Sequence, residues 1–255
     1  MHNYLPTKTL LSNRIILVTG AGSGIGQAAA KTFAKHGATV VLLGRHTGRL
    51  EETYDAIESA GGPTPAMITF DLEKAPAIDY YALGESLFNE FGKLHGLLHN
   101  AAQLDLLSRI DDYDYETWQK IIQVNLNAPF LLTQTCLPLL RKADDASILF
   151  TSDQYGRKGK AYWGAYGVSK FAIEGLMQTL ADELENSNIR VNSIAPVPTQ
   201  TSLRAWVYPG EDPLTLPLPE SLMGSYLYLM GADSLQVNGE ALTAQPSEHY
   251  QPVGA

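Results

Sequence analysis

The stretch IILVTGAGSGIGQAAAKTFAKH, residues 15–36, decides the fold. Its apolar start, Ile15–Val18, is typical of a buried strand, and residues 27–36 have the composition of a helix. Between them lie glycines at positions 20, 22, 24 and 26. Such a turn lets backbone approach the pyrophosphate of a dinucleotide at the start of a helix. The stretch therefore predicts the first strand, turn and helix of a dinucleotide-binding domain.

The same alternation of strand and helix continues along the chain. Strands are predicted at 14–18, 39–43, 66–69, 96–99, 147–151, 190–194 and 240–244, and helices at 24–36, 49–60, 78–91, 115–140, 165–186 and 219–230. Strands that are separated by helices need crossover connections, and these favour a parallel sheet. We therefore expect one doubly wound Rossmann-type α/β domain over residues 1–255, with a parallel sheet of about seven strands flanked by helices.

Composition limits the partners and the compartment. The 255 residues are 45% hydrophobic, and the formal net charge is −9. This acidity argues against a nucleic-acid or anionic-membrane surface, and no stretch of about 20 apolar residues is present to span a bilayer. Cys136 is the only cysteine, so an internal disulfide is impossible and a cytoplasmic location is expected. No His, Asp and Glu cluster has metal-site spacing, so no metal is expected.

A tyrosine and a lysine lie four residues apart in the sequence AYGVSK. Tyr166 and Lys170 share one face of the predicted helix, so the ammonium lies near the phenol. A phenol with a pKa of about 10 exchanges protons poorly at neutral pH until a neighbouring cation lowers that pKa. The pair therefore indicates an acid/base group next to a bound nicotinamide.

Together these motifs resemble a known family. The motifs are Thr19-Gly20-x-x-x-Gly24-x-Gly26, Asn100-Ala101, a lone Asn125, Ser152 and Tyr166-x-x-x-Lys170. In this order they resemble the classical short-chain dehydrogenases/reductases, from about Leu11 to Gln245. Longer runs such as Trp163-Gly164-Ala165-Tyr166 resemble the bacterial YciK-like oxidoreductases within that family.

The resemblance implies a catalytic set of Asn125, Ser152, Tyr166 and Lys170. Tyr166 would exchange the proton, and Lys170 would lower its pKa and bind the nicotinamide ribose. Ser152, at the end of a strand, would reach a substrate carbonyl. The interval from Ser152 to Tyr166 is one residue longer than is typical, so Thr151 is the alternative. Asn125 would interrupt its helix and hold a water that links Lys170 to solvent.

The expected cofactor is NADP(H). The second strand ends in Arg45, where NAD-preferring relatives carry an acidic residue, and a guanidinium can bind a ribose 2′-phosphate. The alternative for Arg45 is a solvated surface arginine. Asp71 is expected to line the adenine pocket, and its alternative is an aspartate that caps the segment after it. The predicted cofactor-binding residues are Gly20, Ser23, Gly24, Ile25, Gly26, Arg45, Asp71, Leu72, Asn100, Tyr166, Lys170, Thr199 and Thr201.

Two positions depart from the family pattern. Ala102 and Val197 stand where glycine is usual, which leaves open how tightly the nicotinamide end is bound. The proline-rich segment 201–219 is expected to form a short lid over the substrate pocket. The basic and aromatic residues 155–163 fit either a solvated loop or an anionic substrate.

The expected function is NADP(H)-dependent interconversion of a carbonyl and an alcohol by hydride transfer on a small molecule. A catalytically silent NADPH-binding sensor or scaffold is the alternative, and a sugar-nucleotide epimerase or dehydratase is a second one. The resemblance also implies a homodimer or homotetramer. The sequence does not identify the substrate.

Overall fold

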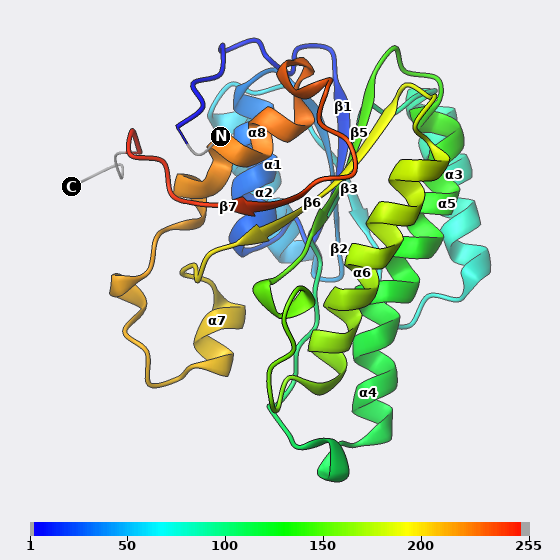
Figure 1. Cartoon of the computed structure of the whole chain (residues 1–255). Helices are drawn as coiled ribbons and strands as arrows, with labels where there is room; N and C mark the ends of the chain where they lie inside the picture. Colours follow the sequence, from blue (N-terminus) through cyan, green and yellow to red (C-terminus); the bar gives the residue numbers. More distant parts are fainter. Residues whose placement is uncertain (1–2, 251–255) are drawn as a thin grey trace.

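The computed structural model describes residues 3–250. Within them, seven parallel strands form one sheet in the order β3-β2-β1-β4-β5-β6-β7, with helices on both faces (Figure 1). This confirms the predicted fold class. The outermost parts of the predicted domain, residues 1–2 and 251–255, lie outside the described residues. The strands are β1 (Ile15–Thr19), β2 (Thr39–Gly44), β3 (Ala66–Thr69), β4 (Gly96–His99), β5 (Ala146–Thr151), β6 (Ile189–Pro196) and β7 (Ala241–Ala244).

Helices occur at all six predicted positions, but two of these are divided and one further short helix was not predicted. The predicted helix 219–230 consists of a 3₁₀ turn (Pro219–Leu222) followed by an α-helix that begins at Met223. The predicted helix 115–140 consists of α4 (Tyr115–Ile122), a π-helical turn (Gln123–Asn127) and α5 (Ala128–Leu140). A π-turn inserts an extra residue into the helical repeat, so the two flanking helices present different faces. The remaining α-helices are α1 (Gly24–Lys35), α2 (Thr47–Ser59), α3 (Ala77–Phe91), α6 (Gly164–Glu183), α7 (Ser202–Val207) and α8 (Met223–Met230).

The sheet has a hydrophobic core on each face. Leu17 of β1 belongs to the core beneath α3, α5 and α6, whereas its neighbours Ile16 and Val18 belong to the core beneath α1, α2 and α8. Side chains of a strand alternate between faces, and here both faces are covered. The central strands β1, β4 and β5 are consequently mostly apolar, with few polar residues among them.

The connections between strands place the ligand site at the carboxyl ends of the central strands. β1 pairs with β2 on one side and with β4 on the other, so the winding direction changes between these strands. In doubly wound sheets the crevice beyond the carboxyl ends of the strands at this switch point binds ligands. The glycine turn after β1 lies there.

The segment 201–219 extends from the carboxyl end of the sheet, after β6. It contains α7 and a short 3₁₀ turn (Pro213–Thr215), and Figure 1 shows α7 away from the sheet, below β6. The Thr201 side chain caps α7 by accepting a hydrogen bond from the Arg204 amide. Between residues 3 and 250, every helix is too short or too polar to cross a membrane.

Candidate active site

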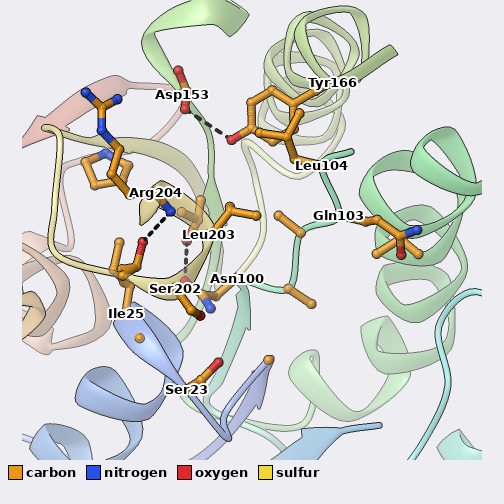
Figure 2. Close-up of a pocket in the computed structure, with 18 of the residues that line it drawn as sticks. Ser23, Ile25, Asn100, Gln103, Leu104, Asp153, Tyr166, Ser202, Leu203 and Arg204 are labelled. Carbon is orange, nitrogen blue, oxygen red and sulfur yellow. Dashed lines mark hydrogen bonds between the residues drawn. The ribbon is translucent and has the colours of Figure 1, made fainter. Parts of the chain in front are cut away.

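One cavity of about 320 Å³ opens at the carboxyl ends of β1, β2, β4, β5 and β6. It brings together most of the residues that the sequence predicts for the site (Figure 2). The predicted residues that line it are Gly20, Ser23, Gly24, Ile25, Arg45, Asp71, Leu72, Asn100, Ser152, Tyr166, Lys170, Thr199 and Thr201. Gly26 and Asn125 do not line the cavity, because both are buried behind it.

The glycine turn depends on close backbone packing. Gly20 and Gly24 have φ values of +67° and +55°, and residues other than glycine rarely adopt such backbone angles. A Cβ atom on Gly26 would lie 2.3 Å from the Gly20 carbonyl oxygen and 2.5 Å from Nδ2 of Asn100. Helix α1 can therefore approach the turn only because position 26 has no side chain.

The start of α1 suits an anionic ligand. The Ser23 side chain makes no capping hydrogen bond, and the first turn carries no acidic residue. The first amides of a helix lack intrahelical acceptors and carry a partial positive charge. In addition, Thr19 Oγ1 accepts hydrogen bonds from the amides of Asn100 and Ala101, so the turns after β1 and β4 are tied together. The residues present thus fit a pyrophosphate.

The end of β2 is basic. Arg45, His46 and Arg49 are exposed and line the cavity, and Arg45 forms no salt bridge within residues 3–250. A free guanidinium at this place fits a phosphate group. On the neighbouring strand end, Asp71 accepts a hydrogen bond from the Glu73 amide at 3.0 Å. Asp71 therefore caps the following turn, as one alternative held, while it also lines the cavity.

Tyr166 and Lys170 lie on the first turns of α6, and both are buried. The Lys170 ammonium donates a hydrogen bond of 2.7 Å to the Thr151 carbonyl and lies 5.5 Å from the centre of the Tyr166 ring. Burial lowers the pKa of Lys170 to about 8. The pair is therefore close together, as the spacing predicts.

The expected lowering of the Tyr166 pKa is wrong for this structure. Burial first, and then the Asp153 carboxylate, raise the pKa of Tyr166 well above its usual value. The Tyr166 hydroxyl donates a 3.1 Å hydrogen bond to Oδ2 of Asp153 (Figure 2). A carboxylate that accepts from a phenol favours the protonated phenol. Tyr166 is consequently held as a proton donor.

Asn125 occupies the π-helical turn, so the predicted interruption of the helix is confirmed. Its Oδ1 accepts from the Gln103 amide at 2.7 Å, and its Nδ2 donates to the Gln103 carbonyl at 2.9 Å and to Ser169 Oγ at 3.1 Å. The side chain thus joins the loop after β4 to α6, one residue before Lys170. A water held by Asn125 stays a prediction.

Comparison with known proteins decides the family. The model of the short chain dehydrogenase family matches residues 14–212. The chain belongs to this family. Over 246 residues it is 45% identical to the uncharacterized oxidoreductase YciK of Escherichia coli K12, with 96% of this chain and 97% of that protein covered. The YciK-like resemblance is confirmed, and the chain is an oxidoreductase of the short-chain dehydrogenase family.

Solved structures agree with the computed fold. A short chain dehydrogenase from Pseudomonas syringae has a TM-score of 0.93 at 53% identity, covering 95% of this chain and 98% of that one. One from Escherichia coli CFT073 is complexed with NADPH and has a TM-score of 0.92 at 46% identity, covering 94% and 100%. One from Shigella flexneri is complexed with NADP and has a TM-score of 0.92 at 44% identity, with the same coverage.

The residues at the end of β5 differ from the expected catalytic arrangement, because Ser152 makes no hydrogen bond to Tyr166. Ser152 is 2% exposed, and its buried Oγ has no hydrogen-bond partner within the described chain. Thr151, the alternative, donates a 3.4 Å hydrogen bond to Asn100 Oδ1. The group that contacts the Tyr166 hydroxyl is Asp153, which the sequence analysis missed. The sequence contained a sign of this: the interval from Ser152 to Tyr166 is one residue longer than is typical, and the interval from Asp153 to Tyr166 has the typical length.

The two departures from glycine are accommodated without strain. Neither Ala102 nor Val197 has a positive φ. The Val197 amide donates to the Ala244 carbonyl at 3.1 Å, and this bond extends the pairing of β6 with β7. The Thr199 hydroxyl then donates to the Val197 carbonyl at 2.6 Å. The backbone at Val197 is therefore fixed by the sheet and places Thr199 at the cavity.

No metal-binding cluster accompanies these residues. Within residues 3–250, no three His, Cys, Asp or Glu side chains gather in a way that could hold a metal ion. The charged residues that line the cavity include the buried Lys170 and the half-buried Asp153. Arg204, which also lines it, is paired with Glu211 through two hydrogen bonds of 2.7 and 2.8 Å.

Proposed function

We propose that this short-chain dehydrogenase is an NADP(H)-dependent oxidoreductase that interconverts a carbonyl and an alcohol by hydride transfer. In this proposal Tyr166 is the acid/base. The observation that carries it is that a single cavity is lined both by the glycine turn and by Tyr166 and Lys170. The cavity thus joins a phosphate-binding element to a proton donor.

Arg45 supports the choice of the phosphorylated cofactor. Its exposed guanidinium lines the cavity at the end of β2, without a carboxylate on the same strand end. A guanidinium binds phosphate through paired hydrogen bonds, whereas a carboxylate there would repel it. The relatives that are complexed with NADP and NADPH share more than 40% of their residues with this chain.

Tyr166, Lys170 and Asn125 each have a task in this mechanism. When bound, the nicotinamide ring exchanges a hydride with the substrate carbon. Tyr166, held protonated, donates its proton to the carbonyl oxygen and thereby neutralises the developing alkoxide. Lys170 keeps a positive charge near that oxygen and is positioned by the Thr151 carbonyl. Asn125 is a positioning residue, because it fixes α6 against the loop after β4.

Three further expectations are kept as proposals. Residues 201–219 form a lid, since Leu203, Val207 and Tyr208 from this segment line the cavity. The chain acts in the cytoplasm. It assembles as a homodimer or homotetramer, for which the exposed apolar residues Phe130 on α5 and Phe171 on α6 provide contact surface.

The proposal is tested by turnover. Purified protein is supplied with NADPH and, separately, with NADH, and with a panel of ketones, aldehydes, quinones and β-ketoacyl thioesters. We expect cofactor oxidation with NADPH at a higher kcat/KM than with NADH. Tight NADPH binding without turnover of any carbonyl compound would favour the sensor or scaffold. Turnover of nucleotide sugars without net NADPH oxidation would favour the epimerase.

A further inference from the structure

Asp153 places a carboxylate beside the proton donor of the site. Its Oδ2 accepts from the Tyr166 hydroxyl at 3.1 Å, and its Oδ1 accepts from the Tyr155 amide at 2.9 Å. The second bond fixes the carboxylate, because it caps the 3₁₀ turn Gln154–Gly156. A carboxylate offers about four acceptor positions, so two remain for a ligand.

No cation of the described chain forms a salt bridge with this carboxylate. The nearby Arg204 is already paired with Glu211. The Lys170 ammonium lies beyond salt-bridge distance and donates to the Thr151 carbonyl instead. Lys170 attracts Asp153 only at longer range, where this carboxylate opposes the lowering of the Lys170 pKa by burial. A cation supplied by a ligand would therefore be the first to contact the carboxylate directly.

The surroundings of Asp153 strengthen its attraction for a cation. The rings of Tyr155 and Trp163 lie 4.0 Å apart between centres, and Trp163 lies 6.3 Å from Tyr208. These three aromatic residues line the same cavity as Asp153. Apolar walls lower the local dielectric constant and strengthen a charge pair. Aromatic faces also attract cations: the Arg204 guanidinium already lies 3.7 Å from the centre of the Tyr208 ring, which leaves Tyr155 and Trp163 for a cation of the ligand.

Asp153 would disfavour the reduction of a carbonyl substrate that carries no positive charge. Its oxygen gains negative charge as the hydride arrives, and it must lie next to the Tyr166 hydroxyl, which Asp153 contacts. Negative charge beside a carboxylate is destabilised unless a positive group stands nearby. Lys170 offsets part of this repulsion from a distance, and an ammonium group on the substrate, close to the carbonyl, would pair directly with Asp153 and offset more of it.

We propose that the substrate is an amino ketone or amino alcohol whose protonated nitrogen, a few bonds from the reacting carbon, pairs with Asp153. This inference rests on the proposed function and names its substrate class. The hydride adds to the carbonyl carbon, the π electrons move to the oxygen, and the oxygen takes the Tyr166 proton. The ammonium keeps its proton throughout and solvent reprotonates Tyr166, so NADPH, the amino ketone and one proton give NADP⁺ and the amino alcohol.

A matched pair of ketones tests the inference. β-Dimethylaminopropiophenone carries a protonated amine at neutral pH, and isocaprophenone replaces that nitrogen by carbon. Binding to the complex of the protein with NADP⁺ is measured by calorimetry, because this complex has no hydride to give. We expect the amino ketone to bind at least tenfold more tightly than isocaprophenone. In Asp153→Asn, which keeps the shape but not the charge, that preference disappears.

Asp144→Asn is the control. Asp144 is exposed before β5 begins, and Asp153 follows its end, so the six residues of β5, about 20 Å at roughly 3.3 Å each, lie between them. The loss of Asp144 therefore changes net charge far from the cavity. We expect the wild-type preference in this variant. Equal binding of the two ketones by the wild-type protein would overturn the inference, and so would a preference that survives Asp153→Asn. Failure of the proposed function gives a different result, because it is read in the turnover assay: NADPH is not oxidised with any carbonyl compound, whether or not the ketones bind.

Discussion

Replacing Gly26 by alanine tests the packing on which the cofactor site depends. The new Cβ would lie 2.3 Å from the Gly20 carbonyl oxygen, more than 1 Å inside ordinary contact. Both the helix and the turn are backbone, so neither can move aside as a flexible side chain would. We therefore expect a cost of about 3 kcal/mol in the free energy of unfolding, at the upper end of the usual range for overpacking.

The cost is measured by thermal unfolding followed by circular dichroism, without cofactor. For a chain of this size, about 3 kcal/mol corresponds to a fall in Tm of about 6–12 °C. Relief of the clash must separate the turn from α1, which displaces the amides that would bind the pyrophosphate. NADPH affinity, measured by titration at a temperature where the variant is folded, should therefore fall at least tenfold.

Gly48→Ala is the matched control. Gly48 lies in the first turn of α2, and a Cβ there meets nothing within 4 Å. Alanine in a helix is favoured over glycine by about 0.5–1 kcal/mol, so this variant should be as stable as the wild type or slightly more so. If Gly26→Ala unfolds at the wild-type temperature and binds NADPH normally, the argument from close packing is refuted.

Three further perturbations have defined outcomes. Arg45→Asp should weaken NADPH far more than NADH in binding titrations, because the carboxylate repels a 2′-phosphate, and equal weakening would contradict the assignment. Since burial lowers the pKa of Lys170 to about 8, its charge is present below that pH and lost above it. The kcat/KM for NADPH should therefore fall as the pH rises through about 8, and a profile that stays flat there would oppose a role for the charge. Asn125→Ala removes three hydrogen bonds, of which the one to Ser169 is buried and the two to Gln103 are partly buried. It should lower the free energy of unfolding by about 1–3 kcal/mol, whereas an unchanged value would show that Asn125 does not hold α6.

The sequence predicts best those parts of the site that single motifs encode. The glycine turn follows β1 directly, so its position needs only the strand and helix around it. Tyr166 and Lys170 lie on one helix, and the helical repeat alone brings them to one face. Most of the seven strands are predicted because they are short apolar runs that alternate with helices, as in β1 and β2. Local patterns are sufficient for all of these.

Local sequence patterns do not predict contacts that depend on the exact residue at which a strand or helix ends. Which residue after β5 contacts Tyr166 is decided by the last strand residue, Thr151, and by the 3₁₀ turn that Asp153 caps. A shift of one residue there exchanges the side chains that face the cavity. Helix α7 was missed because six residues are too few to show a helical period.

The raised pKa of Tyr166 was missed for a related reason. The sequence places Lys170 beside Tyr166, but it gives neither the burial of the phenol nor the carboxylate opposite it. In the structure these two effects determine the pKa, and the Lys170 ammonium is directed to the Thr151 carbonyl. Long-range packing, rather than the motif, therefore sets the protonation state.

The central claim is that Tyr166 supplies the proton for a reduction by NADPH bound in the same cavity. The most direct measurement compares Tyr166→Phe with the wild-type protein, in NADPH affinity by titration and in the rate of NADPH oxidation with a turned-over ketone. The account predicts NADPH affinity within about twofold and a rate that falls by about 10²–10⁴-fold, the usual range for loss of a general acid. A variant that oxidises NADPH at the wild-type rate would contradict it.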